Sequence, residues 1–150
     1  MQVYSNVIRI LNAEGVDYQA SEHEPVRTSE EAARVRGVEL KTGVKAMVLK
    51  TSEGDFFLIL IPADHKVDFK KAAEMEKTKH VSLANPDEVL KLTGCKLGAV
   101  PPFGHKTKLK TCMQDTVLDN DWVNFNAGLR TRSVKMRSQD LKKIINPIMF

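Results

Sequence analysis

Six consecutive apolar residues at positions 56–61, followed at once by Pro62, constrain the fold of this chain most strongly. The run is much shorter than the roughly 20 apolar residues that a membrane-spanning helix needs. A strand that is apolar at every position is typical of one covered on both faces. The run therefore predicts a buried strand over 55–61. Ser52, Glu53 and Gly54 separate it from the apolar-patterned segment 44–51, which predicts a hairpin between the two.

Helix signatures surround this hairpin. Thr28 and Glu31 form a capping box for a helix that ends at Gly37, and Asn85 begins a second helix that ends by Gly94. Apolar periodicity predicts a first helix that ends near position 15 and a last one that ends before position 147. The remaining predicted elements are a helix at 68–77 and strands at 17–22, 80–83, 107–113, 122–126 and 130–136.

These elements predict one α+β domain over 1–150, in which helices pack on a mixed, mostly antiparallel sheet. The net charge of +4 is compatible with a nucleic-acid partner without demanding one. Two cysteines without CxxC spacing fit a reducing compartment, and the first residues lack a secretory signal pattern, so we expect a cytoplasmic protein with no membrane contact.

A loop rich in glycine and proline, 93–104, is the first candidate for a site. Glycine permits positive φ and close approach, and proline stiffens the chain. A stiff loop whose N–H groups face outward can bind an anion, or an oxygen that becomes anionic during a reaction. The alternative is a simple connecting turn.

The usual catalytic motifs are missing from this chain. The sequence has no nucleophile elbow, no phosphate-binding P-loop and no histidine spacing that suits zinc, so we expect no metal and no cofactor. Cys95 is better explained as a small buried thiol than as a nucleophile. Lys45 shares a strand face with apolar Met47 and Leu49, which means either that its ammonium reaches the sheet edge or that it stands at a pocket.

Several segments, in order along nearly the whole chain, resemble the YbaK/ProX family, the free-standing relatives of the editing domain of bacterial prolyl-tRNA synthetase. The matching segments are H-x-P-x-x-T-x-x-E-A-A at 23–33, Gly43-Val44-Lys45, 57–64, the G-x-x-x-P loop with Gly98 and Pro102, 125–128 and Asp140-Leu141. The resemblance implies a barrel-like sheet. It also implies an aminoacyl-tRNA deacylase that hydrolyses the ester of misacylated tRNA in trans, with an aminoacyl-tRNA synthetase as a further candidate partner.

The resemblance implies roles for particular residues. The N–H groups of Gly98, Ala99 and Val100 would stabilise the oxyanion, and Lys45 would anchor the terminal nucleotide. Attack would come from the substrate's ribose hydroxyl or from a water that it orients, without a protein nucleophile. Residues predicted to contact the substrate are His23, Thr28, Pro101, Pro102, Asn126 and Gly128.

The sequence leaves open which of several small amino acids is removed from the tRNA. Mischarged tRNA-Pro is the expected tRNA. Ala46 follows Lys45 where alanine-specific relatives tend to carry asparagine, which argues against alanine and leaves cysteine, serine, threonine or another small residue. Two other classes of function also stay open: a non-catalytic module that binds tRNA or a synthetase, and a protein that hydrolyses other small esters or binds nucleotides.

Overall fold

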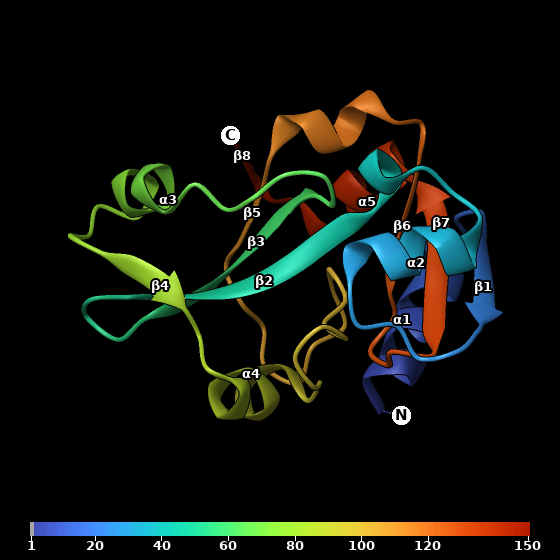
Figure 1. Ribbon diagram of the computed structural model, residues 1–150, viewed down its shortest axis with the longest axis horizontal. Helices are drawn as coiled ribbons and strands as arrows, with labels where there is room; N and C mark the ends of the chain where they lie inside the picture. Colours follow the sequence, from blue (N-terminus) through green and yellow to red (C-terminus); the bar gives the residue numbers. More distant parts are fainter. Residues whose placement is uncertain (1) are drawn as a thin grey trace.

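The structure is a computed structural model that describes residues 2–150, and Figure 1 shows the arrangement of its elements. In chain order, these are α1 (Gln2–Glu14), β1 (Tyr18–Glu22), α2 (Ser29–Arg36), the 3₁₀ helix η1 (Leu40–Thr42), β2 (Val44–Thr51), β3 (Phe56–Pro62), α3 (Phe69–Met75), β4 (Val81–Leu83), α4 (Pro86–Thr93), β5 (Thr111–Met113), the 3₁₀ helix η2 (Asp115–Asp119), β6 (Trp122–Asn126), β7 (Arg132–Arg137), α5 (Ser138–Ile145) and β8 (Ile148–Met149).

The strands form two sheets, one with the order β4-β2-β3-β5-β8 and one with the order β1-β7-β6. Pairing is antiparallel except for β3 with β5 and β5 with β8. A single bridge between Gly43 and Asn124 links β6 to the start of β2. The predicted α+β class and the mixed, mostly antiparallel pairing are confirmed. The strands described over 2–150 form no closed barrel, so the barrel-like shape is not confirmed.

Strand β3 occupies the centre of the larger sheet and is covered on both faces, as predicted. Phe57, Ile59 and Ile61 belong to one buried cluster, and Leu58 and Leu60 belong to the other. Alternating side chains of one strand therefore enter two separate cores. In Figure 1 the long β2–β3 hairpin runs from the three-stranded sheet toward α3 and β4.

The predicted helix caps are present. The Thr28 side chain accepts a hydrogen bond from the Glu31 N–H at 3.1 Å, and Gly37 ends α2 in the left-handed region with φ of 69°. Asn85 and Glu88 cap each other's N–H groups at the start of α4. These local signatures fix both ends of α2 and the start of α4, the helix that precedes the Gly/Pro loop.

The strand predicted over 107–113 is wrong in its first half. The structure contains only the short β5 there. The N–H groups of Lys106 and Thr107 donate to the carbonyls of Thr93 and Leu92 at the end of α4, at 3.1 and 3.0 Å. This segment therefore closes the Gly/Pro loop against α4 before the chain enters the sheet.

Gly128, in the turn between β6 and β7, packs against α1. A Cβ at this position would lie 3.0 Å from the Tyr4 nitrogen and 3.2 Å from Val3 Cγ1, and φ is +94°. Gly54 has a similar φ of +89° but open space around it. The comparison of these two glycines separates steric overlap from backbone strain.

We expect Gly128→Ala to lower the free energy of unfolding more than Gly54→Ala. Both substitutions carry the strain of positive φ, about 1–2 kcal/mol, but only Gly128→Ala also collides with α1, which adds about 1–3 kcal/mol. Urea denaturation of the two variants measures the difference. Equal losses would contradict the close packing of this turn on α1.

Candidate functional site

A cavity of about 300 Å³ lies between α2, β2, the loop that follows α4, and β6. Of the residues predicted for the site, it is lined by Thr28, Lys45, Gly98, Val100 and Asn126. His23, Ala99, Pro101, Pro102 and Gly128 are not part of its wall. The fold thus brings the predicted lysine and the predicted loop to one cavity.

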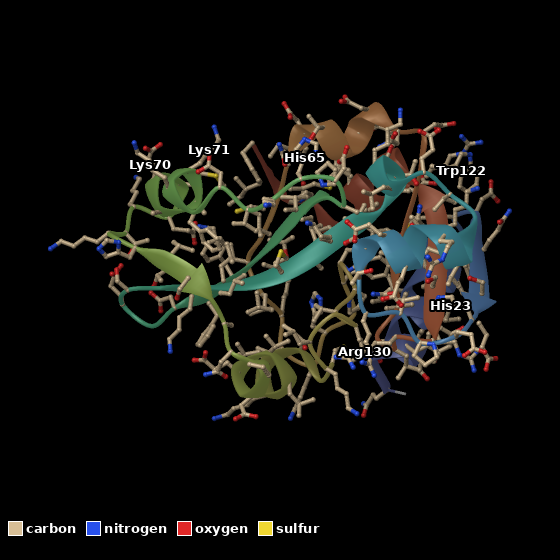
Figure 2. The ribbon with its side chains drawn as sticks, in the orientation of Figure 1. His23, His65, Lys70, Lys71, Trp122 and Arg130 are labelled. Carbon is tan, nitrogen blue, oxygen red and sulfur yellow. The ribbon has the colours of Figure 1, made fainter. Side chains whose placement is uncertain are left out.

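Lys45 stands near the start of β2, with its side chain partly buried. Its Nζ donates a hydrogen bond to the carbonyl of His65, which follows the end of β3 (Figure 2). Burial lowers the pKa of the Lys45 ammonium, while the carboxylates of Glu30 and Asp64 raise it. The cation is therefore held in a fixed position on the cavity wall, and its catalytic role stays a prediction.

The predicted oxyanion loop offers two N–H groups rather than three. Ala99 is buried, and its N–H donates to the Lys96 carbonyl at 3.0 Å, so its predicted role is corrected. The N–H groups of Gly98 and Val100 have no acceptor within residues 2–150. These two remain as candidate donors to a substrate.

Pro101 and Pro102 do not narrow the cavity as predicted. Both are buried away from its wall. The Pro101 carbonyl accepts a hydrogen bond from His105 Nε2, and burial lowers the pKa of His105 while this bond raises it. The proline pair therefore fixes the loop on the core beneath it.

His23 does not line the cavity and is linked to it through other residues, and its predicted contact with the substrate stays a prediction. Its Nε2 is hydrogen-bonded to Ser133 Oγ at 2.6 Å, and Ser133 Oγ also accepts from Arg36 Nε at 2.7 Å. Thr28 has two roles in the structure, because it caps α2 and also lines the cavity.

Arg36, at the end of α2, was missed by the sequence analysis. Besides Ser133, its guanidinium donates to Asn124 Oδ1 at 2.8 Å and to Asn126 Oδ1 at 2.6 Å. Burial lowers the pKa of Arg36 to about 10, so the group stays charged at neutral pH. No carboxylate within residues 2–150 pairs with it. A basic residue in the last turn of a helix is ordinarily explained by the helix dipole. The partners of Arg36 come from distant strands, so no local pattern in the sequence indicates its place in the site.

Asn126 joins Arg36 to the Gly/Pro loop. Its Oδ1 accepts from Arg36, and its Nδ2 donates to the carbonyl of Gly98. Gly128 does not line the cavity but also contacts the loop, because its N–H donates to the Ala99 carbonyl at 3.0 Å. Gly128 therefore supports the loop in this structure, and its predicted contact with the substrate stays a prediction.

The cavity wall carries positive charge and main-chain donors. Arg27, Arg36 and Lys45 line it, and none of the described residues that line it is acidic, cysteine or histidine. Both thiols are buried, and burial raises the pKa of Cys95 and of Cys112, which disfavours a thiolate nucleophile. Such a wall suits an anionic group, or a carbonyl oxygen that gains negative charge.

The model of the aminoacyl-tRNA editing domain matches residues 23–144 of this chain. The chain belongs to this family. It is 34% identical over 148 residues to the multifunctional Ser/Thr-tRNA deacylase ProXp-y of Escherichia coli (strain K12), a match that covers 96% of this chain and 89% of that protein. It is 25% identical over 150 residues to the prolyl-tRNA editing protein ProX of Acetoanaerobium sticklandii, with 97% and 92% covered.

A solved structure agrees with these relatives. The chain superposes on a solved structure described as "Crystal structure of a putative trans-editing enzyme for prolyl tRNA synthetase", with a TM-score of 0.88 and 26% identity. The match covers 100% of this chain and 96% of that one. The family resemblance is confirmed, and with it the class of activity: this editing protein is an aminoacyl-tRNA deacylase, a hydrolase that acts on the ester of aminoacyl-tRNA. Over residues 2–150, no helix has the length and apolar character to cross a bilayer.

Proposed function

We propose that this deacylase removes a small amino acid with a side-chain oxygen, serine or threonine, from mischarged tRNA. The observation that carries the proposal is one cavity lined by Lys45, by Arg36 and by two loop residues, Gly98 and Val100, whose N–H groups have no acceptor within residues 2–150. The editing domain acts on free aminoacyl-tRNA in the cytoplasm, with tRNA-Pro as the first tRNA to test and prolyl-tRNA synthetase as the first candidate partner. The names of two similar proteins, a prolyl-tRNA editing protein and a trans-editing enzyme for prolyl-tRNA synthetase, support this choice of tRNA and partner.

The N–H groups of Gly98 and Val100 receive the ester carbonyl oxygen as it gains charge. One preorganised donor of this kind contributes about 2.7–4 kcal/mol to the transition state. A water molecule adds to the carbonyl carbon, the ester C–O bond then breaks, and the ribose oxygen leaves with the water's proton. No histidine, cysteine or carboxylate lines the described cavity wall, so the neighbouring ribose hydroxyl orients the water.

Lys45 anchors the terminal nucleotide through its phosphate. An ammonium has three N–H donors, and the His65 carbonyl accepts one of them. The two that remain can bind phosphate oxygens while the bond to His65 keeps the side chain in place. The anchor sets the distance between the ester and the loop.

Arg36 selects the amino-acid side chain. A guanidinium has five N–H groups, and three of those on Arg36 donate to neutral oxygens of Ser133, Asn124 and Asn126. A serine or threonine hydroxyl can accept from the remaining donors, whereas the alanine side chain offers them no acceptor. The 34% identity to a Ser/Thr-tRNA deacylase supports this choice of substrate.

A panel of labelled aminoacyl-tRNAs tests the proposed function. We expect release of serine and threonine from tRNA-Pro to be faster than release of alanine, cysteine or proline. Fastest release of alanine would contradict the role of Arg36. Binding of tRNA without release of any amino acid would favour the non-catalytic module, and equal turnover of simple esters or free nucleotides would favour the remaining alternative.

Lys45→Ala is expected to lower turnover by about 100-fold, because a small displacement of the ester from the loop donors costs most of the rate. The matched control is Lys50→Ala on the same strand. Lys50 pairs with Glu88 at 2.7 Å and does not line the cavity. Steady-state deacylation with circular dichroism as a folding check measures both variants. Near-normal turnover by folded Lys45→Ala would refute the anchor.

Arg36→Met is expected to lower the ratio of kcat/KM for serine over alanine by about 10-fold or more, since a hydrogen bond to a charged group is worth about 1.5–3 kcal/mol. The measurement uses Ser-tRNA and Ala-tRNA made on the same tRNA. The control is Arg34→Met, an exposed arginine of the same helix. An equal loss on both substrates, with the ratio unchanged, would show that Arg36 does not read the side chain.

A further inference from the structure

Consecutive carbonyl groups of the Gly/Pro loop, at 97–99, are all hydrogen-bonded to the turn at 126–130. Arg130 contributes two of these bonds, since its Nη2 and Nε donate to the Leu97 carbonyl at 2.6 and 3.2 Å. Figure 2 shows Arg130 beside the loop that follows α4. A carbonyl that accepts two donors from one planar guanidinium is restrained in direction as well as distance.

The same turn supplies the other two bonds. The Asn126 side chain donates to the Gly98 carbonyl, and the Gly128 N–H donates to the Ala99 carbonyl at 3.0 Å. Three neighbouring peptide groups are therefore oriented from one short segment on one side of the loop.

The hydrogen bonds to these carbonyls also determine the direction of the loop N–H groups. The peptides of the loop are trans, so each C=O and the N–H of the next residue point in opposite directions. The bond from Arg130 to Leu97 turns the Gly98 N–H away from the turn, and the bond from Gly128 to Ala99 does the same for the Val100 N–H. These are the two N–H groups without an acceptor within residues 2–150.

The orientation of the Leu97–Gly98 peptide depends most on its hydrogen bonds to Arg130. Gly98 is exposed, has φ of +85°, and an added Cβ would meet only Arg130 Nε, at 3.9 Å. Glycine allows this peptide to rotate, and Arg130 is the one side chain found near the missing Cβ within residues 2–150. The guanidinium of Arg130 is the group that holds it.

We propose that Arg130 is a positioning residue for deacylation, which clamps the Leu97–Gly98 peptide so that the Gly98 N–H faces the ester oxygen. The inference rests on the proposed function, since it needs an oxyanion to form at this loop. Arg130 touches the loop and acts through it. A rival explanation for a partly exposed arginine is a contact with a tRNA phosphate, and the two explanations differ in which kinetic constant they change.

The test compares Arg130→Met with Arg137→Met in single-turnover deacylation of Ser-tRNA at saturating enzyme. Arg137 lies at the far end of β7, where it pairs with Asp121 at 2.8 Å. We expect Arg130→Met to lower the rate at saturation by about 10- to 100-fold and Arg137→Met to leave it unchanged. The expected loss is smaller than the roughly 100- to 1,000-fold cost of removing an oxyanion donor, because the Gly98 N–H is misdirected and not removed. Arg130→Lys, which keeps one donor near the carbonyl, is expected to recover part of the rate.

Binding of an amide-linked, non-hydrolysable seryl-tRNA separates the explanations. We expect Arg130→Met to bind this analogue as tightly as wild type and to unfold at the same temperature as Arg137→Met. Weaker binding with a shallower salt dependence and an unchanged rate at saturation would replace the clamp with a phosphate contact. A lower unfolding temperature with parallel loss of binding would replace it with a general structural role.

The clamp and the proposed function fail in distinguishable ways. If wild-type protein releases no amino acid from any tRNA, the proposed function is wrong. If wild type is active and Arg130→Met stays within about twofold of Arg137→Met, the proposed function stands and the clamp is wrong.

Discussion

The chemistry proposed for this protein depends on where the carbonyl groups of one loop are bonded. A loop with free carbonyls would present acceptors as readily as donors and would repel a developing oxyanion. Here the carbonyls at 97–99 are all engaged by the turn at 126–130. In each trans peptide the C=O and the N–H point in opposite directions. Hydrogen bonds that hold the carbonyls on one side therefore turn the N–H groups to the other side, where a substrate can accept from them.

The two sheets contribute to this arrangement in different ways. The turn that holds the loop joins β6 and β7, whose register is set by antiparallel pairing from Trp122↔Arg137 to Asn126↔Ser133. Phe125 of β6 also packs edge-on against Phe103 of the loop, with ring centroids 5.9 Å apart. The larger sheet supplies Lys45 from β2. The bridge between Gly43 and Asn124 brings these parts together, and no Cβ fits at Gly43 without approaching Ala63 to 2.9 Å.

Local signals in the sequence were enough to predict the central strand, the helix caps and the unusual lysine. Each depends on neighbours within a few residues: the apolar run of β3, the pairing of Thr28 with Glu31, the alternation around Lys45. The direction of a peptide group is different, because it depends on partners far along the chain. The three consecutive donors predicted at Gly98, Ala99 and Val100 therefore became two, once Lys96 accepted the middle N–H.

Arg36 could not be predicted from its sequence neighbours either, because its partners lie on distant strands. These partners are two amides and a hydroxyl, and the charge of the cavity explains why. A carboxylate would satisfy a buried guanidinium more completely, but it would also cancel the positive potential of the cavity. The oxygens of Asn124, Asn126 and Ser133 occupy three N–H groups and leave the net charge in place. The cost is a charge held out of water, which lowers the pKa of Arg36 to about 10 without removing its proton at neutral pH. This arrangement suits a site that is proposed to attract an electron-rich oxygen. The positive field of Arg36 destabilises the empty cavity, and the same field stabilises the ligand when it is bound.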